Sequence, residues 1–91
     1  MKKNFCHVAH YYDSSENCDI YLVFDAGSLD DHYLRRLAGR YLRDSSYYKA
    51  DCIKCVGLHA FLSPFDLESF VSDLLVINPG CIILNFGCVE L

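Results

Sequence analysis

The chain has 91 residues, of which 53% are hydrophobic and 22% are charged, and its formal net charge is −4. This length is enough for one core and too short for two, so we expect a single globular domain over residues 1–91. The high apolar content excludes a disordered segment, and the negative charge argues against a broad nucleic-acid footprint.

The cysteines and the apolar runs indicate the cellular compartment of the chain. Most of the six cysteines lie inside apolar runs, where a thiol packs as a small hydrophobe. The start of the chain lacks the uninterrupted apolar stretch of a secretory signal, and the runs at 74–77 and 81–84 are too short to cross a bilayer. We therefore expect a cytoplasmic protein with reduced thiols and no membrane anchor.

The first third of the chain predicts a β-hairpin. Residues 5–12 and 18–26 are rich in β-branched and aromatic side chains, and the polar cluster 13–17 separates them. Alternation places one set of the second strand toward the core, namely Cys18, Ile20, Leu22, Phe24 and Ala26. Tyr21 and Val23 should then face the other side of the sheet.

A helix is expected over residues 29–43. Ser28 and Asp31 have the spacing of a capping box, and apolar residues then recur every three or four positions. That stripe consists of Leu29, Tyr33, Leu34, Leu37, Ala38, Tyr41 and Leu42. The cluster 44–46 ends this helix, and residues 52–60 have the composition of a third strand.

The last third predicts a second helix and a fourth strand. Ser63 can cap a helix that has Pro64 in its first turn, and the run 78–80 supplies a stop. Its expected buried stripe is Leu67, Phe70, Val71, Leu74 and Leu75. Residues 81–89 are apolar on both faces, which predicts a central strand.

These elements give the order ββαβαβ and an α/β fold, in the form of an α+β two-layer sandwich. We expect a four-stranded mixed sheet with both helices packed on one face. The other face would stay open, with Tyr21 and Val23 on it. An open apolar face needs a cover, which a partner or a second copy of the chain would supply.

Two groupings of residues are candidates for a chemical site. Cys52, Cys55 and His59 have short metal-ligand spacing, but a strand would point Cys52 and Cys55 to opposite faces. The four histidines are accompanied by neither a Gly-x-Ser-x-Gly elbow nor a Cys/His signature. The sequence therefore predicts no enzyme, no cofactor and no metal as its first interpretation.

Arginines on the first helix are the most specific surface feature. Arg35, Arg36, Arg40 and Arg43 make up four of the eight Lys and Arg residues. Spacings of three and four put the last three on one outward face, with His32 one turn earlier. Guanidinium groups pair with carboxylates and phosphates, although a solvated helix face carries the same charges. We predict a partner-binding surface made of these arginines, His32 and Tyr21.

Acidic residues offer a second binding face. They are Asp66, Glu68 and Asp73 on the second helix, Asp13 and Glu16 in the hairpin turn, and Asp19 and Asp25 on the second strand. Such a surface can imitate duplex phosphates, and it can equally be ordinary solubility charge. The sequence leaves open whether the arginines or the acids form the binding face.

The leading hypothesis is a non-enzymatic interaction protein that inhibits or regulates a larger protein or ribonucleoprotein, without binding nucleic acid or membrane directly. In its small size, its acidity and its lack of a catalytic motif, the chain resembles the inhibitors that phages and mobile elements encode against host defences, anti-CRISPR proteins among them. This resemblance is one of size and charge, transfers no residue, and implies action in the host cytoplasm. The alternatives are a metal or thiol protein built on Cys52, Cys55 and His59, with Cys6 or Cys88, and a homo-oligomeric module that pairs through its open sheet face.

Overall fold

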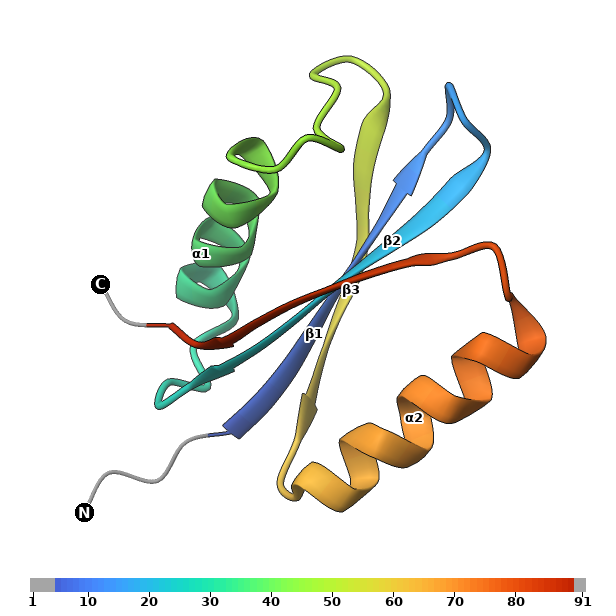
Figure 1. Cartoon of the computed structure of the whole chain (residues 1–91). Helices are drawn as coiled ribbons and strands as arrows, with labels where there is room; N and C mark the ends of the chain where they lie inside the picture. The colour runs from blue at the N-terminus through green and yellow to red at the C-terminus, as the bar shows by residue number, and fades with distance from the viewer. Residues whose placement is uncertain (1–4, 90–91) are drawn as a thin grey trace.

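The computed structural model describes residues 5–89 as four strands and two helices in the order ββαβαβ (Figure 1). The strands are β1 (Phe5–Asp13), β2 (Cys18–Ala26), β3 (Ile53–Phe61) and β4 (Ile82–Cys88), and the helices are α1 (Asp31–Arg43) and α2 (Pro64–Ile77). The predicted α/β class, the element order and the mixed sheet are confirmed. Neither helix is long and apolar enough to cross a membrane within the described residues.

The four strands form one sheet in the order β3-β1-β2-β4. β1 pairs antiparallel with β2 and with β3, whereas β4 pairs parallel with β2. The prediction that the last strand is central was wrong, because β4 lies at an edge. Its two apolar faces have another cause: Ile82 and Leu84 pack into the core on one side of the sheet, and Ile83 packs on the other.

The two helices lie on opposite faces of the sheet, so the prediction that both pack on one face was also wrong (Figure 1). The connection from β2 to β3 passes over β1, and the connection from β3 to β4 passes back over β1 and β2. A right-handed crossover that reverses its direction must place its helix on the other face. The result is three layers, with the sheet between α1 and α2.

The larger part of the core lies under α1. Leu34, Leu37 and Leu42 are buried against alternate residues of the central strands, which include Ile20, Leu22 and Phe24. α1 starts two residues later than predicted, and Asp30 caps it by accepting hydrogen bonds from the backbone of His32 and Tyr33. Leu29 therefore lies before the helix and is 57% exposed, outside the buried stripe.

The smaller part of the core lies under α2. Leu67, Phe70 and Leu74 pack on Val8, Tyr21 and Val23. The predicted open face is therefore covered from within the chain, and Tyr21 is only 6% exposed. A homodimer through that face is excluded as a consequence, because α2 already occupies it.

All six cysteines are free thiols. Burial raises the pKa of Cys6 and of Cys81, and nearby Asp25 and Asp19 respectively raise these values further. A raised pKa keeps a thiol protonated and poorly nucleophilic at neutral pH. Cys6 is buried, and Cys81 packs against the cluster of Val8, Tyr21 and Val23.

Candidate functional site

The exposed face of α1 carries three arginines that form no hydrogen bond or ion pair in the part of the chain that the structure describes. Arg36, Arg40 and Arg43 are exposed, and none of them forms a hydrogen bond or an ion pair within residues 5–89. Their spacing of four and three residues stacks them along one side of the helix. The last two lie at the carboxyl end of α1, where the helix dipole favours positive charge.

Arg35 is the exception among the predicted arginines. Its Nε donates to Asp31 Oδ2 at 2.7 Å, and its guanidinium also donates to the Cys55 sulfur at 3.2 Å. The neighbouring Asp31 carboxylate raises the pKa of Arg35. These contacts hold Arg35 toward β3, so it is the least available of the four to a partner.

A hollow of about 400 Å³ lies among these arginines. Gly39 is part of its lining, and a Cβ atom built at this position would meet nothing within 4 Å. Tyr33 and Leu37 contribute apolar lining, and Arg36, Arg40 and Arg43 bring the charge. We call this feature the arginine groove: Arg36, Arg40 and Arg43 around Gly39.

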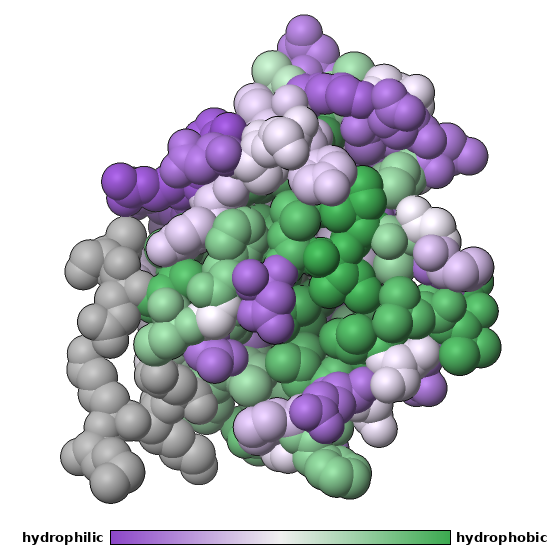
Figure 2. Space-filling view, viewed as in Figure 1, coloured by the Kyte–Doolittle hydropathy of each residue, from purple (hydrophilic) through white to green (hydrophobic). Residues whose placement is uncertain are grey.

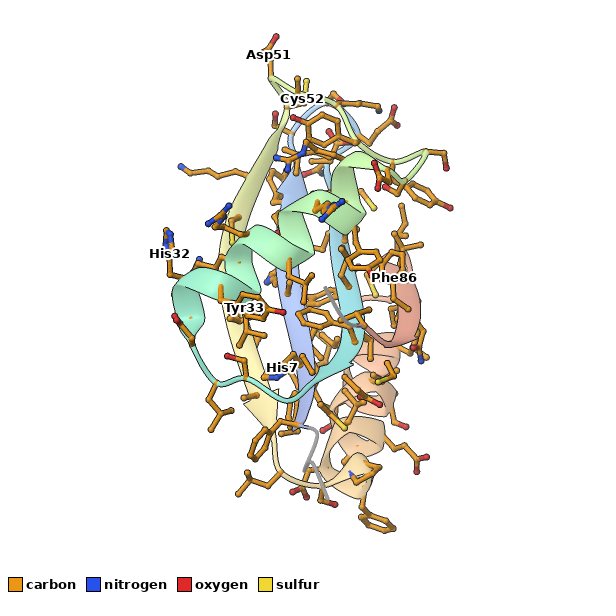
Figure 3. The ribbon with its side chains drawn as sticks, turned by 90° about the vertical axis from the view of Figure 1, so that its left-hand side faces the viewer. His7, His32, Tyr33, Asp51, Cys52 and Phe86 are labelled. Carbon is orange, nitrogen blue, oxygen red and sulfur yellow. The ribbon has the colours of Figure 1, made fainter. Side chains whose placement is uncertain are left out.

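Of the other two predicted site residues, His32 lies near the arginines and Tyr21 does not. His32 is exposed in the first turn of α1, one turn before Arg36, and lies on the same side of the molecule (Figure 3). Tyr21 does not belong to this surface, because it is buried under α2 and stacks on His10 with ring centroids 4.3 Å apart. Tyr33 and Gly39 were missed, although a glycine inside an amphipathic helical pattern is a signal of close approach or open space.

The metal alternative fails on geometry. The pairing of β1 with β3 shifts by one residue between His10 and Tyr11, so the residues of β3 change face at that point. Cys55 contacts Arg35 on the α1 side, whereas the His59 ring lies 5.6 Å from Phe70 on the α2 side. No cluster of three or more His, Cys, Asp or Glu with metal-binding geometry occurs in the described part of the chain.

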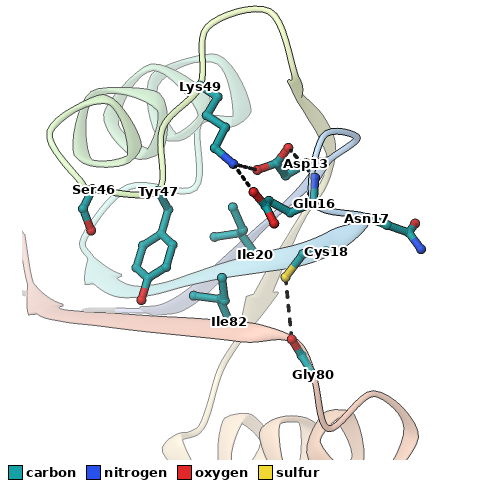
Figure 4. A pocket seen from close by; sticks show the side chains of 10 residues that line it. All are labelled: Asp13, Glu16, Asn17, Cys18, Ile20, Ser46, Tyr47, Lys49, Gly80 and Ile82. Carbon is teal, nitrogen blue, oxygen red and sulfur yellow. Dashed lines mark hydrogen bonds and ion pairs between the residues drawn. The ribbon is translucent and has the colours of Figure 1, made fainter.

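A second hollow, of about 470 Å³, lies between the hairpin turn and the start of β4 (Figure 4). Its cation, Lys49, is already neutralised, because its Nζ lies 2.8 Å from Glu16 Oε1 and 3.4 Å from Asp13 Oδ2. Its thiol, Cys18, contacts the carbonyl of Gly80 at 3.6 Å. These polar groups satisfy one another, so the arginine groove is the better candidate.

His10 is the one described histidine with a carboxylate partner. Its Nε2 lies 2.8 Å from Asp19 Oδ1, and Asn78 Nδ2 donates to Asp19 Oδ2 at 2.9 Å. A catalytic pair would need a nucleophile beside the imidazole, and no Ser or Cys side chain bonds to His10 among residues 5–89. This network instead ties the hairpin to the loop between α2 and β4.

The acidic residues do not form one surface. Asp66, Glu68 and Asp73 are exposed on α2, whereas the acids of the hairpin are engaged. Asp13 accepts hydrogen bonds from Ser15, which lowers its pKa, and it also pairs with Lys49. Of these candidate acids, the exposed ones outside the hairpin are therefore those of α2, on the face of the sheet opposite the arginines of α1.

Comparison of the chain with protein-family models, with curated proteins and with solved structures finds no match in any of the three. The choice of site therefore rests on the geometry of α1. The arginine groove has the chemistry to bind an anionic group through several guanidinium groups at once.

Proposed function

We propose that this chain is a non-enzymatic binding protein that docks its arginine groove onto an acidic surface of a larger protein or ribonucleoprotein, and so inhibits or regulates it. One observation carries the proposal: Arg36, Arg40 and Arg43 converge around a hollow and have no partner within the described residues.

Charge supports an acidic protein as the partner. A single exposed ion pair contributes less than about 1 kcal/mol, but several forks that share one partner surface lose water together and gain more. Elsewhere the chain is acidic, since its net charge is −4 despite these arginines. Such a distribution orients an acidic partner toward α1 and repels the extended phosphate backbone of nucleic acid.

The narrower form of the proposal is an inhibitor of a host defence complex that acts in the cytoplasm. It follows from the resemblance in size and charge to anti-CRISPR proteins. Large ribonucleoprotein effectors are therefore the first partner class to test, with nuclease treatment to separate binding of protein from binding of RNA.

The test compares three forms of the chain as bait in nuclease-treated host lysate: wild type, Arg36→Gln with Arg40→Gln, and Lys54→Glu. Lys54 is exposed on β3 outside the groove, and both variants change the net charge by the same amount. Quantitative mass spectrometry of the eluates identifies partners, and titration of the purified partner then gives an affinity for each form.

We expect the Arg36→Gln, Arg40→Gln variant to bind at least about tenfold more weakly, since each charge-assisted hydrogen bond contributes about 1.5–3 kcal/mol. Lys54→Glu should bind like wild type. A partner that both variants lose equally would mean that net charge and not the groove governs binding. A partner that both retain would remove the groove from the site.

A further inference from the structure

The outer edge of β4 is an unprotected strand edge. Among residues 5–89 β4 pairs with β2 alone, so the outer side of Ile82–Asn85 has no strand beside it. Soluble proteins usually guard such an edge with charge, above all with lysine. β3, the opposite edge, contains Lys54, but Ile82–Cys88 contains no charged residue, and none occurs anywhere between Asp73 and Glu90.

Only the first part of β4 is regular. Val23 pairs with Asn85 and Phe24 with Gly87, so Phe86 is an extra residue in the ladder. Gly87 has a φ of +67°, and its N–H donates to the Asn85 side chain at 2.9 Å. A bulge of this kind interrupts pairing. The segment available to a further strand is therefore Ile82–Asn85.

Apolar side chains flank this edge. Val76 and Ile77, in the last turn of α2, are 83% and 80% exposed, and Leu75 is 49% exposed. The chain passes from this turn through residues 78–81 into β4. Figure 2 shows hydrophobic side chains gathered over the side of the molecule where β4 and the end of α2 lie, with a hydrophilic group among them. A contiguous apolar surface on a water-soluble domain marks an interface.

We propose that a second copy of this chain covers the surface by pairing Ile82–Asn85 antiparallel with its own equivalent across a two-fold axis. The argument for a copy is electrostatic. Two molecules with a net charge of −4 repel each other over most of their surfaces. The uncharged stretch between Asp73 and Glu90 is where they meet without like charges in contact.

A two-fold dimer is compatible with the arrangement of the helices around the sheet. Antiparallel pairing of two edges in one continuous sheet requires a two-fold axis perpendicular to the sheet, and such an interface is isologous. Both α2 helices then lie on one face, so their last turns flank the seam. Both α1 helices lie on the other face, which places two arginine grooves on the same side of the dimer. The dimer itself does not depend on the function proposed for the groove.

Sedimentation equilibrium over a wide range of protein concentration tests the dimer. We expect wild type to reach twice the mass of the chain and Val76→Lys with Ile77→Lys to stay monomeric. Phe65→Lys is the control, because Phe65 is 77% exposed in the first turn of the same helix, far from the end that precedes β4. It should dimerise like wild type.

Amide hydrogen exchange locates the seam independently of these variants. Protection of amides in Ile82–Asn85 should rise with protein concentration, while that of β3 should not change. A wild-type chain that stays monomeric at every concentration overturns the proposal. So does a dimer that survives Val76→Lys with Ile77→Lys, or one whose formation leaves β4 exchange unaltered.

Discussion

His7 is a buried titratable residue without a hydrogen bond among the described residues. It is fully buried on the α1 side of β1, where its ring stacks on Phe24 at 5.4 Å (Figure 3). Neither ring nitrogen has a hydrogen-bond partner of acceptable geometry within residues 5–89. Burial lowers the pKa of His7, and the backbone of Ala26 and Ser28 and the charge of Asp25 offset only part of this effect. Burial therefore favours the neutral imidazole in the folded state.

A pH dependence of stability follows from His7. In the unfolded chain its pKa is about 6.5, so between that value and the lower folded value the unfolded state binds more protons. The contribution of the neutral His7 to the free energy of unfolding is therefore fully present above about pH 6.5. It decreases as the pH falls below this value, by at most about 1.4 kcal/mol per pH unit for one group. Urea unfolding at several pH values between about 7.5 and about 5 measures how the free energy of unfolding changes with pH.

Two variants assign this slope to His7. His7→Leu removes the unpaired nitrogens, and His7→Gln keeps a polar side chain that cannot titrate. Either should flatten the dependence in this pH range. The lowered pKa of Asp13 acts only in more acidic solution, since its contribution is present above the ordinary pKa of an aspartate, about 3.9, and is lost below it. An unchanged slope in both variants would show that His7 is not its source.

At the scale of the element, α1 combines a buried stripe with an open groove, and the two sides respond differently to mutation. Leu37 is 2% exposed in the core, so Leu37→Ala should lower the free energy of unfolding by roughly 2–5 kcal/mol.

Gly39→Ala should raise the free energy of unfolding by about 0.5–1 kcal/mol, because alanine favours helix and the added methyl group meets no atom. Urea unfolding of both variants tests the helix register. A neutral Leu37→Ala or a destabilising Gly39→Ala would contradict it.

At the scale of the whole molecule, Asn78 joins parts that are far apart in sequence. Its side chain donates to Asp19, which also binds His10, so one carboxylate connects the hairpin with the loop that leads into β4. Asn78→Ala should lower the free energy of unfolding by about 1–2 kcal/mol, since it leaves a half-buried carboxylate short of a donor. Ser72→Ala, at an exposed position of α2, is the control and should be close to neutral. Equal values for the two variants would show that the link contributes nothing.

Features that depend on neighbouring residues in the chain were predictable from the sequence. Periodicity identified every strand and both helices, and it placed Leu34, Leu37 and Leu42 in the core. The polar turn at 13–17 and the cap at Ser63 were also correct. The spacing of Arg36, Arg40 and Arg43 was enough to put them on one exposed face. Each of these features is fixed within a few residues of chain.

The face of the sheet that each element occupies could be read only from the folded structure. The strand order reverses the second crossover, which moves α2 to the opposite face, buries Tyr21 and leaves β4 at an edge. The register shift opposite β1 separates Cys55 from His59. Such outcomes depend on pairing between strands that are distant in sequence, and no local pattern encodes that pairing. The sequence therefore defined the surface that carries the arginines, and the fold defined the surfaces that remain uncovered.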